Sequence, residues 1–255
     1  MILYQDNILD HINTFTLDTL PHTILIKGDV GSGKHLISNY ISDKFGLEQV
    51  DITNNLNLDM IMNIYLTTQP KCYIINSDDI SVKEQNVILK LLEEPNSITF
   101  VILLSSIENL LDTIKNRCYL IKLNPYTKEQ LKSFTKNCSF EDILLPVCTT
   151  PGQVLEYINE DFESMYEFAN RVFLHIKTAN VANILTIPNK VYFTDKLENK
   201  YNIMLFSKLL LFIAKKQLYD VYILTNNYYK ELFIPHVNKK NLFEKYLMEL
   251  KYTIQ

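Results

Sequence analysis

Glycine is scarce in this chain, which has only five glycines among 255 residues. Three of the five fall in the stretch KGDVGSGKH, from Lys27 to His35. No other part of the chain concentrates glycine in this way, so the cluster indicates a loop that needs glycine rather than chance composition. Its spacing follows the phosphate-loop pattern G-x-x-x-x-G-K-[ST], except that His35 stands in the last place.

Paired cysteines are lacking as well. The four cysteines are isolated in the sequence, and no two of them form a C-x-x-C pair: Cys72, Cys118, Cys138 and Cys148. A zinc site usually shows such pairs or closely spaced histidines. We therefore expect no metal site, and we interpret the cysteines as buried thiols in a reducing cytoplasm.

The chain has no long apolar run and no basic leader. Its most apolar segment, IMLFSKLLLFIA at 203–214, has 12 residues and contains Lys208, so it is too short to cross a bilayer. The first ten residues lack a basic segment and include Asp6 and Asp10, which is unlike a signal peptide. The sequence predicts a cytoplasmic protein without a membrane partner.

An excess of basic charge is also missing, since the net charge is −4. Residues 1–163 carry 12 Lys and Arg against 22 Asp and Glu, whereas residues 164–255 carry 13 against 7. A protein that coats nucleic acid would usually be strongly basic, so a stand-alone DNA-binding protein is the weakest hypothesis. The opposite signs indicate either two halves with distinct partners or two solvated surfaces that merely differ in charge.

Short apolar runs alternate with amphipathic segments in the first half. We expect strands at 22–28, 50–52, 71–77, 97–106 and 118–123, and helices at 34–46, 57–68, 81–95 and 108–118. This alternation predicts an α/β fold with a parallel sheet and right-handed crossovers. The glycine-rich loop then lies between a strand and a helix, which is the context that a phosphate loop requires.

The pattern becomes helical after about residue 124. We expect a helix from 126 to 137, others at 150–158, 161–178, 201–220 and 239–252, and a loop at 188–202. Capping boxes support two of the expected helix starts, with Ser81 and Glu84 at one and Thr127 and Gln130 at the other. The second half is therefore predicted to be a helical bundle.

The glycine-rich loop has most of the groups that bind phosphate. Gly28, Gly31 and Gly33 would let backbone N–H groups wrap the phosphates, and Lys34 would add a positive charge. The residue after the lysine normally ligates magnesium through a hydroxyl, and the longer imidazole of His35 suits softer metals better.

Nucleotide hydrolysis also needs a carboxylate at the end of a neighbouring strand. The only candidate strand, YIINSDDIS, has the uncharged Asn76 and Ser77 at its end. Asp78 and Asp79 follow, and we interpret them as turn residues that lead into the Ser81 cap. With His35, two magnesium-holding positions are lost, which argues against ATPase activity.

Two further segments resemble the AAA+ clamp-loader subunits of bacterial DNA polymerase III. NVILKLLEEPNSITFVILLSS (86–106) is similar to their N-A-L-L-K-x-L-E-E-P-P-x-x-x-x-F-I-L-x-T signature, and LLDTIKNRC (110–118) to their L-x-x-T-I-x-S-R-C segment, with Asn116 in place of serine. The resemblance covers residues 20–160 well and the rest by general character. It implies an AAA+ P-loop α/β domain at 1–124, a small helical lid at 125–163 and a helical collar at 164–255 that joins subunits into a ring.

Within that family the chain is most similar to delta-prime subunits, whose nucleotide machinery is commonly degenerate. The resemblance implies gamma/tau-like ATPase and delta-like subunits, the sliding clamp and primed DNA as partners. Arg117 matches the arginine of the S-R-C segment, an arginine finger for the ATP site of the adjacent subunit. Without the motif, Arg117 would be interpreted as a surface arginine that caps a helix end. Gln153 stands where the lid usually carries a sensing arginine or lysine.

Lys90 lies on the L-E-E-P helix, which can face DNA in clamp loaders. It is either a phosphate contact or a solvated lysine.

Three hypotheses for the loop follow from these residues. The main one is a non-hydrolysing clamp-loader subunit that needs no cofactor. The second is an active P-loop ATPase with atypical magnesium ligation. Between them lies a chain that binds ATP, ADP or phosphate through Lys34 and the glycines without cleaving it.

Overall fold

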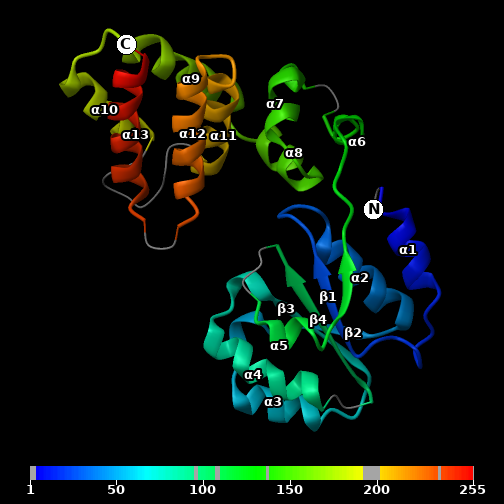
Figure 1. The fold of residues 1–255 in the computed structure, drawn as a ribbon. Helices are drawn as coiled ribbons and strands as arrows, with labels where there is room; N and C mark the ends of the chain where they lie inside the picture. The colour runs from blue at the N-terminus through cyan, green and yellow to red at the C-terminus, as the bar shows by residue number, and fades with distance from the viewer. Residues whose placement is uncertain are drawn as a thin grey trace. The chain divides into compact units, whose positions relative to one another are not determined.

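The computed structural model describes residues 4–94, 97–106, 110–135, 138–191, 202–234 and 237–254 (Figure 1). The chain divides into two compact units. The first comprises Met1–Phe134 together with Thr149–Gln153, and the second comprises Thr135–Cys148 together with Val154–Gln255. The three-part division into α/β domain, lid and collar remains a prediction.

The first unit is built on a five-stranded sheet in the order β2-β3-β4-β1-β5, with every neighbouring pair parallel. Its strands are β1 (Thr23–Lys27), β2 (Glu48–Asp51), β3 (Lys71–Asn76), β4 (Thr99–Ser105) and β5 (Tyr119–Lys122). The three central strands are buried along almost their whole length, as the continuous apolar runs predict for a sheet covered on both faces. The predicted α/β fold with a parallel sheet is confirmed.

Six helices accompany the sheet in the described part of this unit: α1 (Asp6–Asn13), α2 (Lys34–Phe45), α3 (Leu58–Tyr65), α4 (Val82–Glu93), α5 (Asp112–Lys115) and α6 (Lys128–Lys132). Both predicted capping boxes are present, at Ser81 and at Thr127. Gly46 ends α2 with a positive φ of 64°, a conformation that favours glycine.

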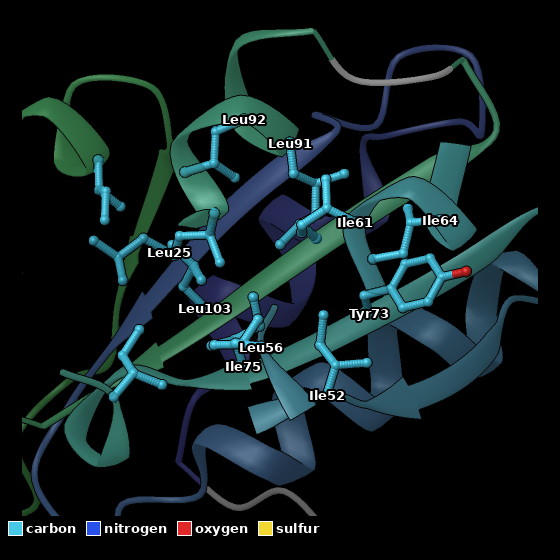
Figure 2. Close-up of a cluster of buried hydrophobic side chains, with 14 of the residues drawn as sticks. Leu25, Ile52, Leu56, Ile61, Ile64, Tyr73, Ile75, Leu91, Leu92 and Leu103 are labelled. Carbon is cyan, nitrogen blue, oxygen red and sulfur yellow. The ribbon is translucent and has the colours of Figure 1, made fainter. Parts of the chain in front are cut away.

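Successive strand residues point to opposite faces of the sheet, and each face has its own core. Leu25 of β1, Tyr73 of β3 and Leu103 of β4 pack with α3 and α4 on one face (Figure 2). Ile24 and Ile26 of β1 belong to the other core, which includes residues of α1 and α2. The two-sided core fixes the carboxyl ends of β1, β3 and β4, where the glycine-rich loop lies.

The second unit is helical in its described residues. It contains α7 (Glu141–Val147), most of α8 (Pro151–Ile158), α9 (Phe162–Ile176), α10 (Val181–Val191), α11 (Ile203–Ala214), α12 (Tyr219–Glu231) and α13 (Lys239–Ile254). Aromatic rings form much of its core: the Tyr228 and Tyr246 rings stack at 4.5 Å, and Phe243 meets Phe206 edge-on at 5.8 Å. No helix in the described part of the chain is long and apolar enough to cross a membrane.

Two expectations for this unit need correction. The predicted helix at 201–220 is interrupted, because α11 ends at Ala214 and α12 begins only at Tyr219, after Leu218 adopts an extended backbone. The predicted loop at 188–202 begins later than expected, since α10 continues to Val191 although it contains Pro188. Residues 192–201 of that expected loop lie outside the described residues.

Candidate phosphate-loop site

The glycine-rich loop connects β1 to α2, as predicted. Gly31 and Gly33 have φ values of 79° and 98°, which other residues rarely adopt. Gly28 is needed for space, because a Cβ there would lie 2.7 Å from Ser32 Oγ and 3.1 Å from Leu123 Cβ. The local backbone of a phosphate loop is therefore intact, and each of the three glycines has a physical reason.

Lys34 begins α2 and is only 8% exposed. Its Nζ donates hydrogen bonds to the carbonyl oxygens of Gly28 (2.8 Å) and Asp29 (3.1 Å) and to Ser106 Oγ (2.5 Å). Burial lowers the pKa of Lys34, while the negative charges of Asp78 and Asp29 act in the opposite direction. The three N–H donors of the ammonium group thus each have an acceptor within the chain.

Asp78 is a part of the site that the sequence interpretation missed. It lies in a 3-10 turn after β3, in agreement with its interpretation as a turn residue. Its carboxylate also reaches the residue directly after β4, because both oxygens accept the backbone N–H of Ser106, at 3.0 and 2.9 Å. The carboxyl ends of β3 and β4 meet at one sheet edge, and that adjacency could have drawn attention to Asp78.

The residues at the end of β3 are used within the chain. Ser77 is buried and donates to the carbonyl of Leu104 at 2.8 Å. Asn76 donates through its side chain to the carboxylate of Asp79. Across the described ranges, no group of three or more His, Cys, Asp or Glu side chains could hold a metal ion.

His35 takes the place of the hydroxyl residue at the start of α2. It is exposed, and its backbone carbonyl accepts a hydrogen bond from Ser38 at 3.0 Å. The backbone of the loop therefore continues into a regular helix despite the substitution, and only the hydroxyl that would face magnesium is missing.

A cavity of about 270 Å³ adjoins the loop. It is lined by loop residues that include Asp29 and Ser32, by residues 122–126, and by Thr149 and Thr150. The Ser32 hydroxyl is buried and has no hydrogen-bond partner in the described part of the chain. The volume of the cavity is close to the lower end of the roughly 300–1,000 Å³ typical of small-molecule pockets.

The segment Thr149–Gln153 is fastened to the loop by short contacts. Thr150 Oγ1 donates to the carbonyl of Val30 at 2.8 Å, and the Gly152 N–H donates to that of Gly31 at 2.9 Å. A Cβ on Gly152 would lie 2.5 Å from the Gly31 Cα, so this approach requires glycine. Gln153 accepts the N–H of Thr149 through Oε1 at 3.0 Å, so the side chain in the sensing position contacts its own helix start.

Arg117 follows α5 and is partly exposed. Its Nη1 donates to the carbonyl of Thr113 at 2.8 Å, and its Nη2 pairs with Glu93 Oε1 at 2.7 Å. The first bond caps the end of α5, which agrees with the alternative interpretation of Arg117 as a surface arginine that caps a helix end. The second links Arg117 to the L-E-E-P helix, so the two segments that carry the family resemblance meet at this ion pair.

Lys90 has an exposed side chain on α4. Its backbone carbonyl accepts a hydrogen bond from the Tyr65 hydroxyl at 2.9 Å. Exposure is compatible with both interpretations of Lys90, the phosphate contact and the solvated lysine. The geometry brings Gly28, Gly31, Gly33 and Lys34 together at the loop.

Two solved structures have a fold similar to that of this chain. A DNA polymerase III gamma-subunit-related protein from Thermotoga maritima aligns over 97% of this chain and 99% of its own, with a TM-score of 0.55 and 16% identity. A RuvB variant from Thermotoga maritima aligns over 97% and 88%, with a TM-score of 0.52 and 13% identity. These likenesses show that the chain shares its fold with these two proteins.

The chain is also similar in sequence to DNA polymerase III subunits. The model of a family described as DNA polymerase III, delta subunit, matches residues 50–127. The DNA polymerase III subunit gamma of Buchnera aphidicola subsp. Schizaphis graminum is 24% identical over 221 residues, which are 70% of this chain and 60% of that protein. The chain therefore spans about three fifths of the length of that curated relative. The chain is thus similar in sequence to subunits of DNA polymerase III, over residues 50–127 in the family model and over 221 residues in the relative.

Proposed function

We propose that the chain is a non-hydrolysing, delta-prime-like subunit of a DNA polymerase III clamp loader. In this role it helps to assemble the ATPase ring and to load the sliding clamp on primed DNA. The observation that carries the proposal is the end of β3. Asn76 and Ser77 replace the carboxylates needed there, and both side chains are hydrogen-bonded to their own chain.

Two other positions support the absence of hydrolysis. His35 offers no hydroxyl for magnesium, and the Gln153 amide is uncharged where the family usually has a cation. A transferring phosphate would therefore meet neither a conventional magnesium site nor a sensing cation. One such loss could be compensated, whereas the combination removes the metal and the lid contact together.

The proposed partners follow from the family. They are gamma/tau-like ATPase subunits, a delta-like subunit, the sliding clamp and primed DNA, all in the cytoplasm. Arg117 would act on the ATP of the adjacent subunit, where a planar guanidinium can stabilise charge on the transferring phosphate. The chain itself needs no cofactor for this role, and the loop could hold ATP, ADP or phosphate without cleaving it.

ATP turnover by the isolated chain tests the absence of hydrolysis. We expect wild type and Lys34→Ala to show the same background phosphate release with magnesium and ATP. Turnover by wild type that Lys34→Ala abolishes would refute the proposal. Co-purification with gamma-like and delta-like subunits tests the assignment to the complex, because a clamp-loader subunit should elute with them as one species.

Asp78 favours a second candidate function, an active ATPase with atypical magnesium ligation. Its carboxylate lies close enough to Lys34 to influence that lysine's pKa, and the glycines keep the loop in its binding conformation. In this case Asp78 would replace the missing strand-end acid. Loss of turnover in both Lys34→Ala and Asp78→Asn would identify this function.

A further inference from the structure

Ser106, directly after β4, joins the loop lysine to a carboxylate. Its hydroxyl accepts Lys34 Nζ at 2.5 Å, and its backbone N–H donates to both oxygens of Asp78 at 2.9 and 3.0 Å. Three elements therefore converge on one residue: the start of α2, the turn after β3 and the end of β4. This arrangement holds a fixed negative charge beside the cation of the phosphate loop.

Because Lys34 is buried, the negative charge of nearby Asp78 matters to the lysine. Lys34 is 8% exposed, and a buried ammonium needs hydrogen-bond acceptors and a countercharge. Two carbonyls and one hydroxyl accept hydrogen bonds from the Lys34 ammonium group, but none of these acceptors carries a full charge. Asp78 and Asp29 supply negative charge nearby, and Asp78 is the stronger influence on Lys34.

A phosphate group would require the same cation. The loop N–H groups and Lys34 would attract it, while the carboxylate of Asp78 would repel it at short range in a poorly solvated site. Phosphate binding would also draw Lys34 Nζ away from at least one of its present acceptors. Carboxylate and phosphate are therefore alternative countercharges for Lys34.

We propose that Asp78 is the built-in countercharge of Lys34, which keeps the loop folded without phosphate and weakens its affinity for the phosphates of a nucleotide. This inference deepens the proposed function, since it rests on the loop being a phosphate loop that does not hydrolyse nucleotide. It attributes the weak affinity for phosphate to the Asp78 carboxylate alone. Removal of the negative charge of Asp78 should therefore turn a weak phosphate site into a stronger one.

The test compares Asp78→Asn with Asp79→Asn in the full chain. Asparagine keeps the shape of Asp78 and an oxygen that can accept the Ser106 N–H, so the substitution removes mainly the charge. Asp79→Asn changes the net charge equally, but Asp79 contacts Asn76 instead of Ser106. ATP and pyrophosphate are titrated calorimetrically at pH 7 without magnesium, which separates recognition of phosphate from recognition of the nucleoside.

For Asp78→Asn, we expect the Kd for both ligands to fall by about tenfold or more, as the loss of a nearby charge in a poorly solvated site predicts. Adding Lys34→Ala to Asp78→Asn should abolish that gain, and Asp79→Asn should bind like wild type. Equal affinities of wild type and Asp78→Asn would overturn the inference. An equal gain in Asp79→Asn, or a gain that survives Lys34→Ala, would also overturn it. A gain with ATP but not with pyrophosphate would show that the nucleoside, not the phosphate, is affected, and would count against it.

Unfolding in urea provides a second measurement that needs no ligand. If Asp78 is the countercharge of Lys34, the effects of Lys34→Ala and Asp78→Asn on the midpoint should be clearly non-additive, and strictly additive effects contradict the inference. If Asp78→Asn does not fold, Asp78→Ser serves in both experiments. The outcomes are separable from those of the proposed function: ATP turnover by wild type would refute the latter, whereas unchanged affinity in Asp78→Asn refutes only the role of Asp78.

Discussion

Lys34 and Arg117 are the two cations on which the functional account depends, and both are held by their own chain. Lys34 is buried among loop carbonyls and Ser106, whereas Arg117 is partly exposed and paired with Glu93. An exposed ion pair contributes little to stability, typically less than about 1 kcal/mol. Arg117 can therefore leave Glu93 for a stronger anion at small cost, which suits a residue that acts on a neighbouring subunit.

Gly152 offers a residue-scale test of how the segment 149–153 is fastened to the loop. Gly152→Ala should lower the free energy of unfolding by about 1–3 kcal/mol, because the new Cβ would overlap the backbone of Gly31. Gly46→Ala is the matched control, since a Cβ there meets nothing within 4 Å and only the positive φ costs about 1 kcal/mol. Urea unfolding measures both, and a Gly152→Ala variant as stable as wild type would contradict the close approach.

Two cysteine thiols with raised pKa values should make the stability of the chain depend on pH. Burial raises the pKa of Cys118 from 9.0 to about 12 and that of Cys72 to about 11. The folded state therefore keeps both protons where the unfolded chain loses them, so stability is fully present below pH 9 and is lost as the pH rises toward 11–12.

Raising the pH from 8 to 10 should lower the free energy of unfolding by about 1 kcal/mol for each of the two thiols. Cys118→Ala should flatten this decline by that amount, whatever its effect at pH 8. Urea titrations at the two pH values provide the comparison. An identical decline in wild type and variant would mean that Cys118 is not protected from ionisation.

At the scale of elements, the strands of the sheet could be predicted because their sequence signals are local. The apolar runs that become β1, β3 and β4 are bounded by glycine, by polar turns or by proline, and the helix after β3 begins with the capping box at Ser81. Four described helices were not predicted: α1, α7, α10 and α12. Pro146 and Pro188 lie inside two of them, and α12 is rich in Asn, Thr and Tyr, which are weak helix formers. Tertiary packing overrides propensity there, as the burial of Thr225 and Tyr228 of α12 shows.

In the candidate site, too, the sequence reveals local patterns but not contacts between distant residues. The spacing of the loop glycines and Lys34 is a local pattern, so the sequence reveals it. The contact of Asp78 with Ser106 joins residues 28 positions apart, and the bond between Gly152 and Gly31 joins residues even farther apart. Such contacts depend on strand order and on the path of the chain back to the loop, which no local pattern contains.

The capping box of α4 gives an element-scale prediction. Ser81 Oγ accepts the Glu84 N–H, and Glu84 Oε2 accepts the Ser81 N–H at 2.7 Å. Ser81→Ala should destabilise the chain by about 1 kcal/mol in urea unfolding, whereas Ser81→Thr should keep the cap and most of the stability. Equal losses in the two variants would show that the hydroxyl is not what holds the helix start.

On the scale of the whole molecule, the two compact units have separate cores. Phe206→Ala opens a cavity in the aromatic core of the helical unit and should cost about 3–5 kcal/mol there. Hydrogen exchange should then accelerate strongly in α11–α13 and much less in β1, β3 and β4. Equal acceleration in both units would mean that they unfold as one cooperative body.

The most direct test of the central claim is the ATPase activity of a reconstituted clamp loader that contains Arg117→Ala. The chain has only two arginines, so Arg171→Ala on α9 is the natural control. An arginine finger contributes a factor of about 10³–10⁵ at the site that it serves. We predict that Arg117→Ala assembles normally but lowers the clamp- and DNA-stimulated ATPase by at least the share of one site, while Arg171→Ala does not. Full ATPase activity in an assembled Arg117→Ala complex would contradict the account.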